Sequence, residues 1–187
     1  GVSVAELSAF AKVMQKNALR VTNTPQNSMD NCGTGGDHSN SFNVSTTAAF
    51  VLAAGGIVMA KHGNRSISSR SGSADTLEQL GLRLETKPEE LADWLNEIGI
   101  AFLYAPAMHP SMRAVMKIRK ELATPTIFNM LGPLINPVQL ETWTQACNCS
   151  TWCFWDGRGE FIGCNPVCAV RKGTGARICS KSSRLWL

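Results

Sequence analysis

The chain has 187 residues, 44% of them hydrophobic, which is enough for one domain or slightly more with a substantial apolar core. Its net charge of +4 resides entirely in residues 143–187, because residues 1–142 hold 12 basic and 12 acidic side chains, so the main body is not a general polyanion binder. No stretch is apolar enough to span a membrane and no signal-peptide pattern opens the chain, so we expect a cytoplasmic location.

The first part of the chain alternates predicted helices and strands. A capping-box pattern predicts a helix over residues 3–19. Residues 28–32 are expected to form a short buried strand that leads into a glycine-rich turn. Ser45 is the expected N-cap of a helix through residue 54. The apolar run 57–60 predicts a second buried strand, which ends at Lys61.

The alternation continues in the second part. Helices are predicted over residues 73–80 and again from Pro88, followed by a strand over 100–104. Residues 111–122 combine an apolar stripe with a basic face, which is typical of a helix, and 127–134 read as a short apolar turn. The pattern predicts an α/β fold with parallel strands, in which ligands bind beyond the carboxyl ends of the strands.

Composition changes abruptly near Thr142. Residues 143–187 contain six of the seven cysteines and four of the five tryptophans. The spacing of these cysteines lacks the paired C-x2-C pattern of a zinc site. A tail translated from a shifted reading frame is therefore preferred over a metal-binding or redox module.

Two loops have the composition that a polyphosphate ligand requires. The first is the glycine turn 33–37, followed by the hydroxyls of a helix start at 43–46, and the second is the basic loop 61–65. Glycines let backbone N–H groups approach phosphate oxygens, and helix N-termini supply further donors. A tight structural turn and an ordinary helix cap are the alternatives.

Three side chains have a functional and a structural interpretation. Lys61 follows an apolar run, where a cation is unfavourable unless an anion pairs with it. His62 is either a proton carrier or a hydrogen-bonded structural imidazole. Arg119 lies on a solvated helix face or binds a carboxylate through both guanidinium nitrogens.

The motifs together resemble one family, the anthranilate phosphoribosyltransferases. They occur in the family's order and spacing over residues 4–138. The matching stretches are GTGGD at 33–37, FNVST at 42–46, KHGNRS at 61–66, SGSAD at 71–75, HPSMR at 109–113, and TIFN, LGPL and NP between 126 and 137.

The resemblance implies a nucleoside phosphorylase/phosphoribosyltransferase-like fold, in which a small helical domain is hinged to a parallel-sheet α/β domain. Because family chains are longer, we expect a fragment that is truncated at its N-terminus. The implied parts are 1–27 (remnant of the helical domain), 28–106 (α/β domain that binds phosphoribosyl pyrophosphate, PRPP), 107–132 (helical segment), 133–142 (return to the α/β domain) and 143–187 (tail outside the family).

The resemblance also implies the reaction and its site. The phosphoribosyl group of PRPP would pass to the amine of anthranilate, giving N-(5-phosphoribosyl)anthranilate and pyrophosphate, a step of tryptophan biosynthesis. The residues that match the family's PRPP site are Gly33, Gly36, Asp37, Ser41, Asn43, Ser45, Thr46, Lys61, Ser69 and Ser73. Those that match its anthranilate site are Gly33, Asn64 and Arg119.

Lys61 and His62 are the catalytic candidates, with a positioning role assigned to His62, and Ser45 is the expected ligand of Mg²⁺. Small-molecule substrates and a homodimer are the implied partners, with neither nucleic acid nor membrane. The chain has no Asp-Glu pair after Thr142, where the family binds a further magnesium ion, so impaired activity is expected.

Two alternatives remain open. A pyrimidine-nucleoside phosphorylase-like enzyme has a similar fold and a lysine–histidine phosphate loop, but the continuation Gly63-Asn64-Arg65 and the pair His109-Pro110 favour the transferase. The second alternative is a non-catalytic fragment with a metal-binding cysteine tail.

Overall fold

The computed structural model describes residues 3–33, 43–66, 72–122 and 126–140, together with the backbone of three later strands. Four predicted site residues, Gly36, Asp37, Ser41 and Ser69, lie outside these ranges.

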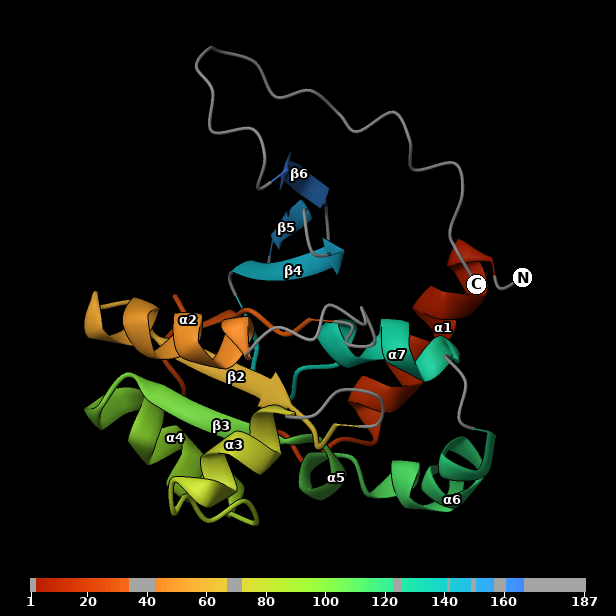
Figure 1. Cartoon of the computed structure of the whole chain (residues 1–187), viewed down its shortest axis with the longest axis horizontal. Coiled ribbons are helices and arrows are strands. Elements are labelled where there is room, and N and C mark those ends of the chain that lie inside the picture. Colours follow the sequence, from red (N-terminus) through yellow and green to blue (C-terminus); the bar gives the residue numbers. More distant parts are fainter. Residues whose placement is uncertain are drawn as a thin grey trace.

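A mixed sheet organises the described part (Figure 1). Its strands are β1 (Met29–Asp30), β2 (Met59–Gly63), β3 (Ile100–Tyr104), β4 (Thr142–Asn148), β5 (Thr151–Asp156) and β6 (Phe161–Pro166). The spatial order is β3-β2-β1-β4-β5-β6. The pairs β1–β2, β2–β3 and β1–β4 are parallel, so the prediction of a parallel sheet is confirmed for these strands, whereas β5 and β6 are antiparallel additions.

The helices are α1 (Val4–Lys16), α2 (Val44–Ala54), α3 (Ser73–Gln79), α4 (Pro88–Glu97), α5 (Ala105–Met108), α6 (Arg113–Leu122) and α7 (Ile127–Leu131), with 3-10 turns η1 (Pro110–Met112) and η2 (Gly132–Leu134). The expected capping box is present, because Ser3 Oγ accepts from the Glu6 N–H while the Glu6 carboxylate accepts from the Ser3 N–H. Pro88 occupies the first turn of α4. Among the described residues, no helix combines the length and apolar character needed to cross a bilayer.

Helices cover both faces of the strands β1–β3. Figure 1 shows α2 on one face and α3 and α4 on the other. The main apolar cluster lies between α4 and the sheet and includes Leu91, Leu95 and Leu103, all almost fully buried. A second cluster joins Leu77 of α3 to Phe102 of β3. These contacts hold in place the strand ends from which the loops after β1 and β2 begin.

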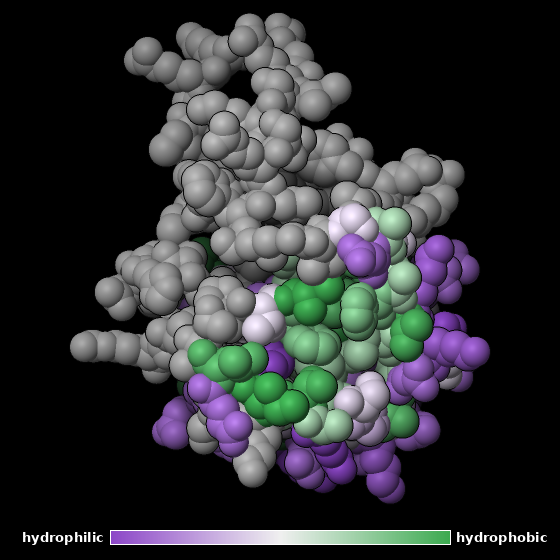
Figure 2. Space-filling model, turned by 90° about the vertical axis from the view of Figure 1, so that its right-hand side faces the viewer, coloured by the Kyte–Doolittle hydropathy of each residue, from purple (hydrophilic) through white to green (hydrophobic). Residues whose placement is uncertain are grey.

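The helical part has an apolar core of its own. Ala11 and Met14 of α1 pack with Leu131 of α7 and with Ile135. This cluster is separate from those of the sheet, so α1 and α7 form a distinct layer beside it. Figure 2, viewed from the side on which α1 and α6 lie, shows apolar side chains gathered on the surface and edged by hydrophilic ones.

Three boundaries differ from the sequence-based expectation. The N-cap of α2 is Asn43 and not Ser45, because Asn43 Oδ1 accepts a 3.1 Å bond from the Thr46 N–H. Strand β2 begins at Met59 and continues through Lys61 to Gly63, since pairing with β3 extends it past the apolar run. Residues 127–134 form α7 and η2 instead of a turn.

The tail also differs from expectation. No strand was predicted in it, yet β5 leads to Asp156 and β4 pairs with β1 in parallel. The local pattern of polar and apolar residues does not predict these strands. They form by pairing with strands already at the edge of the sheet, and strand propensity depends strongly on such neighbours. The domain boundaries derived from the resemblance remain a prediction.

The packing of β3 generates a stability prediction. Leu103→Ala should lower the free energy of unfolding by about 2–5 kcal/mol, because Leu103 is completely buried and its truncation leaves a cavity. Leu80→Ala is the matched control, since Leu80 is 72% exposed and should change stability by less than about 0.5 kcal/mol. Chemical denaturation measures both. Equal effects at the two positions would contradict the described core.

Candidate functional site

Lys61 lies inside a strand and is only 3% exposed. Its ammonium group donates a 3.0 Å hydrogen bond to Asn31 Oδ1 and lies 3.4 Å from Ser45 Oγ. Asn31 also donates through Nδ2 to the Ser45 carbonyl oxygen, at 2.8 Å. A buried cation therefore sits directly at the start of α2, where backbone donors and the helix dipole also favour an anion.

The start of α2 gathers three predicted PRPP residues around one side chain. Asn43 Oδ1 accepts from the Thr46 N–H at 3.1 Å and from Ser45 Oγ at 3.2 Å. Thr46 Oγ1 is buried and has no hydrogen-bond partner among the described residues. A buried hydroxyl without a partner is unfavourable, so this atom is a candidate for contact with a ligand.

A second buried polar group, Asp30, lies at the end of β1, directly before Asn31. Its carboxylate accepts hydrogen bonds from the N–H groups of Cys32 and His62, at 3.0 and 3.2 Å, and from Asn136 Nδ2 at 2.9 Å. Burial raises the pKa of Asp30 to about 6, against the opposing effects of Lys61 and of these donors. Asp30 is therefore ionised at neutral pH.

His62 is a neutral, fully buried imidazole. Its Nδ1 lies 2.9 Å from the Gly132 carbonyl oxygen, which assigns the proton to Nδ1 and leaves the lone pair on Nε2. Desolvation, together with the neighbouring His109 ring 5.2 Å away between centroids, lowers the pKa of His62 to about 3. Nε2 has no partner among the described residues. An imidazole in this state accepts a hydrogen bond but does not carry a positive charge.

The predicted residues Asn64 and Ser73 meet at the carboxyl end of β2. The Ala74 N–H donates to the Asn64 carbonyl oxygen at 3.2 Å. A methyl group at Gly63 would come within 3.1 Å of Ser73 Cβ, so the absence of a side chain there permits the close approach of α3.

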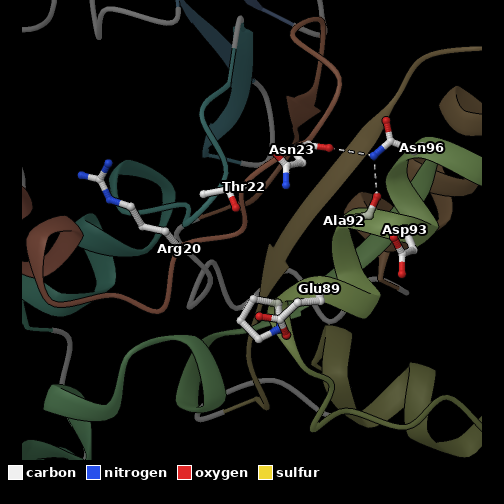
Figure 3. A pocket seen from close by; sticks show the side chains of 8 residues that line it. Arg20, Thr22, Asn23, Glu89, Ala92, Asp93 and Asn96 are labelled. Carbon is white, nitrogen blue, oxygen red and sulfur yellow. Dashed lines mark hydrogen bonds between the residues drawn. The ribbon is translucent and has the colours of Figure 1, made fainter.

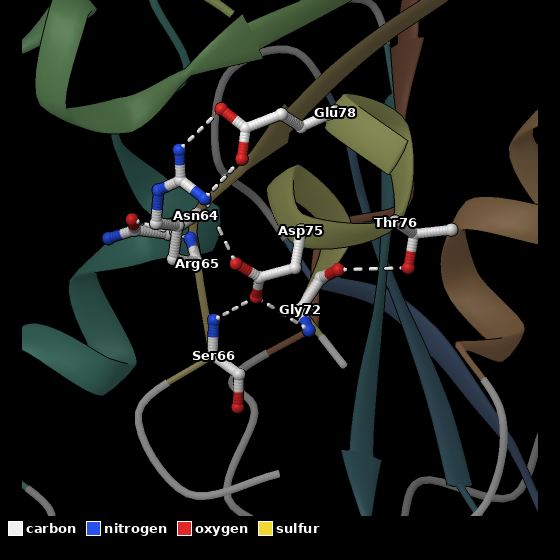
Figure 4. A network of polar contacts seen from close by, with 7 residues as sticks. All are labelled: Asn64, Arg65, Ser66, Gly72, Asp75, Thr76 and Glu78. Carbon is white, nitrogen blue, oxygen red and sulfur yellow. Dashed lines mark hydrogen bonds and ion pairs between the residues drawn. The ribbon is translucent and has the colours of Figure 1, made fainter. Parts of the chain in front are cut away.

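A polar clasp, defined by Arg65, Asp75 and Glu78, holds this region together (Figure 4). Arg65 binds Glu78 through both terminal nitrogens, at 2.7 and 2.8 Å, and Asp75 at 3.2 Å. Asp75 Oδ2 also accepts from the N–H groups of Ser66 and Gly72. One carboxylate thus joins the residue before and the residue after the segment 67–71.

Arg119 is half-buried on α6, apart from the groups around Lys61. Its guanidinium lies 5.4 Å from the centroid of the Phe128 ring and 3.5 Å from Asn129 Oδ1. Burial lowers its pKa. Within the described ranges, these contacts involve none of the other predicted site residues, so the structure does not bring the expected carboxylate-binding group and the phosphate-binding groups into direct contact.

One group of predicted site residues comes together at the start of α2 and in β2: Asn43, Ser45, Thr46 and Lys61. His62 and Asn64 follow Lys61 in the chain, and Ser73 begins α3 close to Gly63. Gly33 continues from the backbone that Asp30 fixes. A pocket elsewhere, between residues 20–23 and the start of α4, is lined by none of these (Figure 3).

Asp30, Asn31 and Asn136 were not predicted as site residues. The signal for the first two was a charged residue and an amide inside a predicted buried strand, directly before the glycine turn.

Asp30, Cys32 and His62 also have the composition of a metal site, since one ligand atom from each lies within 4.8 Å of the others. Their surroundings do not favour a metal ion. The Asp30 carboxylate already accepts three hydrogen bonds, and burial raises the pKa of the Cys32 thiol to about 12, which disfavours the thiolate that a metal ion requires. The oxygens of Asn43 and Ser45 are a better match for Mg²⁺, which prefers hard oxygen ligands and retains water and phosphate oxygens.

The clasp predicts a strong effect at Gly72. Gly72→Ala should destabilise the chain by about 1–3 kcal/mol, because the new methyl group would overlap the backbone nitrogen of Ser66 and lie 2.7 Å from Asp75 Oδ2. Gly132→Ala is the control, since a methyl group there meets nothing within 4 Å. Thermal unfolding compares the two. A Gly72→Ala variant as stable as the control would show that the clasp does not constrain this position.

The buried histidines predict acid sensitivity. His62 and His109 have pKa values of about 3 and about 4 in the folded chain against 6.5 when exposed, so the unfolded chain binds more protons and stability falls as the pH drops below 6.5. The pKa of Asp30 is raised from 3.8 to about 6 by folding, so between these pH values Asp30 makes the folded chain more stable as the pH falls. This single carboxyl offsets only one of the two histidines. We expect a lower melting temperature at pH 5 than at pH 7, and a smaller difference for His109→Gln. A melting temperature that is the same at both pH values would contradict the neutral, buried pair.

Comparison with known proteins agrees with this geometry. Residues 25–146 match the family model described as "Glycosyl transferase family, a/b domain". Anthranilate phosphoribosyltransferases of Listeria monocytogenes serotype 4b and Bacillus cereus (strain G9842) are 59% and 55% identical over 142 residues, which are 76% of this chain. The chain spans 42% of the length of these relatives.

Solved structures give the same result. The anthranilate phosphoribosyltransferase of Thermus thermophilus is similar with a TM-score of 0.71 and 34% identity, over 89% of this chain and 60% of that one. The Saccharomyces cerevisiae enzyme in complex with PRPP and Mg has a TM-score of 0.70 and 27% identity, over 81% of this chain and 52% of that one. The resemblance seen in the motifs is thereby confirmed, and the chain belongs to the glycosyl transferase family with this a/b domain, where it is similar to the anthranilate phosphoribosyltransferases.

Proposed function

We propose that the protein represented by this chain transfers the phosphoribosyl group of PRPP to the amine of anthranilate and releases pyrophosphate. The observation that carries the proposal is the buried ammonium group of Lys61, 3.0 Å from Asn31 Oδ1 and 3.4 Å from Ser45 Oγ at the start of α2. A desolvated cation beside a helix N-terminus supports binding of a polyanion such as the pyrophosphate of PRPP. The Saccharomyces cerevisiae relative binds this substrate.

The PRPP-binding group of the proposal combines side-chain and backbone donors. Lys61 and the N-terminal amides of α2 would hold phosphate oxygens, and the unpartnered hydroxyl of Thr46 would donate to one of them. Ser73, Gly33 and the residues outside the described ranges, Gly36, Asp37, Ser41 and Ser69, belong to the same proposed site. Donors fixed before the substrate arrives stabilise the charge that develops on the departing pyrophosphate.

Magnesium is part of the proposal. Ser45 Oγ would be its protein ligand, with Asn43 Oδ1 at 3.2 Å as a neighbouring oxygen. When bound, Mg²⁺ would neutralise part of the pyrophosphate charge. The ammonium group of Lys61 lies 3.4 Å from Ser45 Oγ, so Mg²⁺ and this ammonium group would repel each other unless phosphate oxygens offset their charges. This is consistent with an ion that arrives with the substrate.

For anthranilate, the proposal assigns binding to Asn64 and Arg119 and a positioning role to His62. Arg119 would bind the carboxylate through both nitrogens, in place of its long contact with Asn129. An aryl amine attacks an anomeric carbon without a strong base, and the transition state has oxocarbenium character as in glycoside hydrolysis. A neutral His62 with a free lone pair on Nε2 is suited to orient an N–H group.

Cytoplasmic location and a homodimer belong to the same proposal. Exposed apolar side chains on α1 and α6, namely Phe10, Val13, Ile118 and Leu122, support a covered face in an assembly.

Replacement of Lys61 tests the proposal. Lys61→Met should weaken PRPP binding, measured calorimetrically with magnesium present, by about tenfold or more, because a charge-assisted contact to phosphate is lost. Lys87→Met removes the same charge from an exposed residue and should leave the affinity unchanged. Circular dichroism checks that both variants fold.

Two results would overturn the proposal. The first is an affinity for PRPP that Lys61→Met does not alter. The second is phosphorolysis of thymidine by the purified chain, which would favour the pyrimidine-nucleoside phosphorylase reading. Loss of anthranilate fluorescence on addition of PRPP measures any residual transfer.

A further inference from the structure

Among the described residues, Asp30 is the most buried charged group that the proposed reaction does not use. It is 1% exposed and lies at the end of β1, directly before the turn that begins at Cys32 and Gly33. On the basis of the proposed function, we propose that Asp30 is a positioning residue that fixes the two PRPP-binding loops relative to each other. It would act through its neighbours and not through contact with the substrate.

The hydrogen bonds of the carboxylate carry this inference. Oδ1 accepts from the backbone N–H of Cys32 at 3.0 Å and from that of His62 at 3.2 Å. The first donor opens the glycine turn, and the second belongs to the strand that carries Lys61. Because one oxygen atom receives both bonds, the two backbones are held at a fixed separation. Ordinary pairing of β1 with β2 does not supply this link, since its register is defined only at Met29 and Met59.

Asn136 anchors the carboxylate from a third segment. Its Nδ2 donates to Asp30 Oδ2 at 2.9 Å and to the Ala60 carbonyl oxygen at 2.8 Å, while its Oδ1 accepts from the Val138 N–H. Every polar atom of the amide is therefore engaged, and Asn136 is itself 9% exposed. A fully satisfied buried network of this kind rigidifies the groups it joins.

Lys61 also acts on this carboxylate. Its positive charge favours the ionised form of Asp30, against the effect of burial, which raises the pKa of Asp30 to about 6. The ammonium group itself donates to Asn31 Oδ1, so Asp30 contributes to the site through the two backbones that it joins.

The experiment compares Asp30→Asn with a matched control in the same strand region. The substitution keeps the shape of the side chain, but it removes the charge and places two amide nitrogens, of residues 30 and 136, against each other. We expect the dissociation constants for PRPP and for inorganic pyrophosphate to rise by about tenfold or more. Ser28→Ala removes another buried hydrogen bond, the 2.6 Å contact of Ser28 Oγ with the Pro25 carbonyl oxygen, and should lower the melting temperature without altering either constant.

A second variant tests the anchoring of the carboxylate. Asn136→Ala removes the donor to Asp30 Oδ2 but leaves both backbone bonds to Oδ1, so it should weaken the binding of PRPP, though less than Asp30→Asn does. It also carries the test if Asp30→Asn does not fold. A folded Asn136→Ala variant that binds PRPP as tightly as the unmodified chain would overturn the inference.

The remaining outcomes separate the inference from the proposed function. If the unmodified chain binds PRPP and Asp30→Asn binds it equally well, the positioning role is wrong and the proposed function stands. If the unmodified chain binds neither PRPP nor pyrophosphate, the proposed function is wrong and the positioning role fails with it.

Discussion

The burial of a lysine ammonium group within a parallel strand is the constraint on which the site depends. A cation is strongly unfavourable in such a place unless polar groups surround it, and the residues that surround Lys61 come from two segments. Asn31 binds it just after β1, Ser45 approaches it from the start of α2, and the charge of Lys61 in turn favours the ionised form of Asp30 at the end of β1. The same contacts that make the burial tolerable also place α2 and the end of β2 where a phosphate chain would meet both.

Local sequence patterns predicted the elements whose boundaries are set by local chemistry. The capping box at Ser3 and Glu6, the proline start of α4 and the apolar strand 100–104 were predicted correctly. Helix α2 was predicted with the wrong N-cap, because Asn43, two residues upstream of Ser45, accepts from the Thr46 N–H and starts the helix at Val44. The continuation of β2 to Gly63 was missed, since Lys61 and His62 look like loop residues until their pairing with β3 is known.

The candidate site was predicted from motifs, but its supporting residues were not. The sequence places the group 43–46 and Lys61 in two separate segments, and only the fold brings them together. Asn136 is 106 residues from Asp30 along the chain, and no periodicity or spacing announces that bond. The antiparallel strands β5 and β6 were likewise missed, because they follow β4 at the free edge of the sheet.

The most direct test of the account is to map PRPP on the chain by nuclear magnetic resonance. A uniformly ¹⁵N-labelled sample titrated with PRPP and magnesium should show shifts of the backbone amides at 43–46 and 61–64, where α2 begins and β2 ends. The amides of Asp93 and Asn96, which line the separate pocket beside α4, should stay unchanged. Shifts confined to that pocket, or none at all, would contradict the claim that the buried lysine organises a phosphate-binding site.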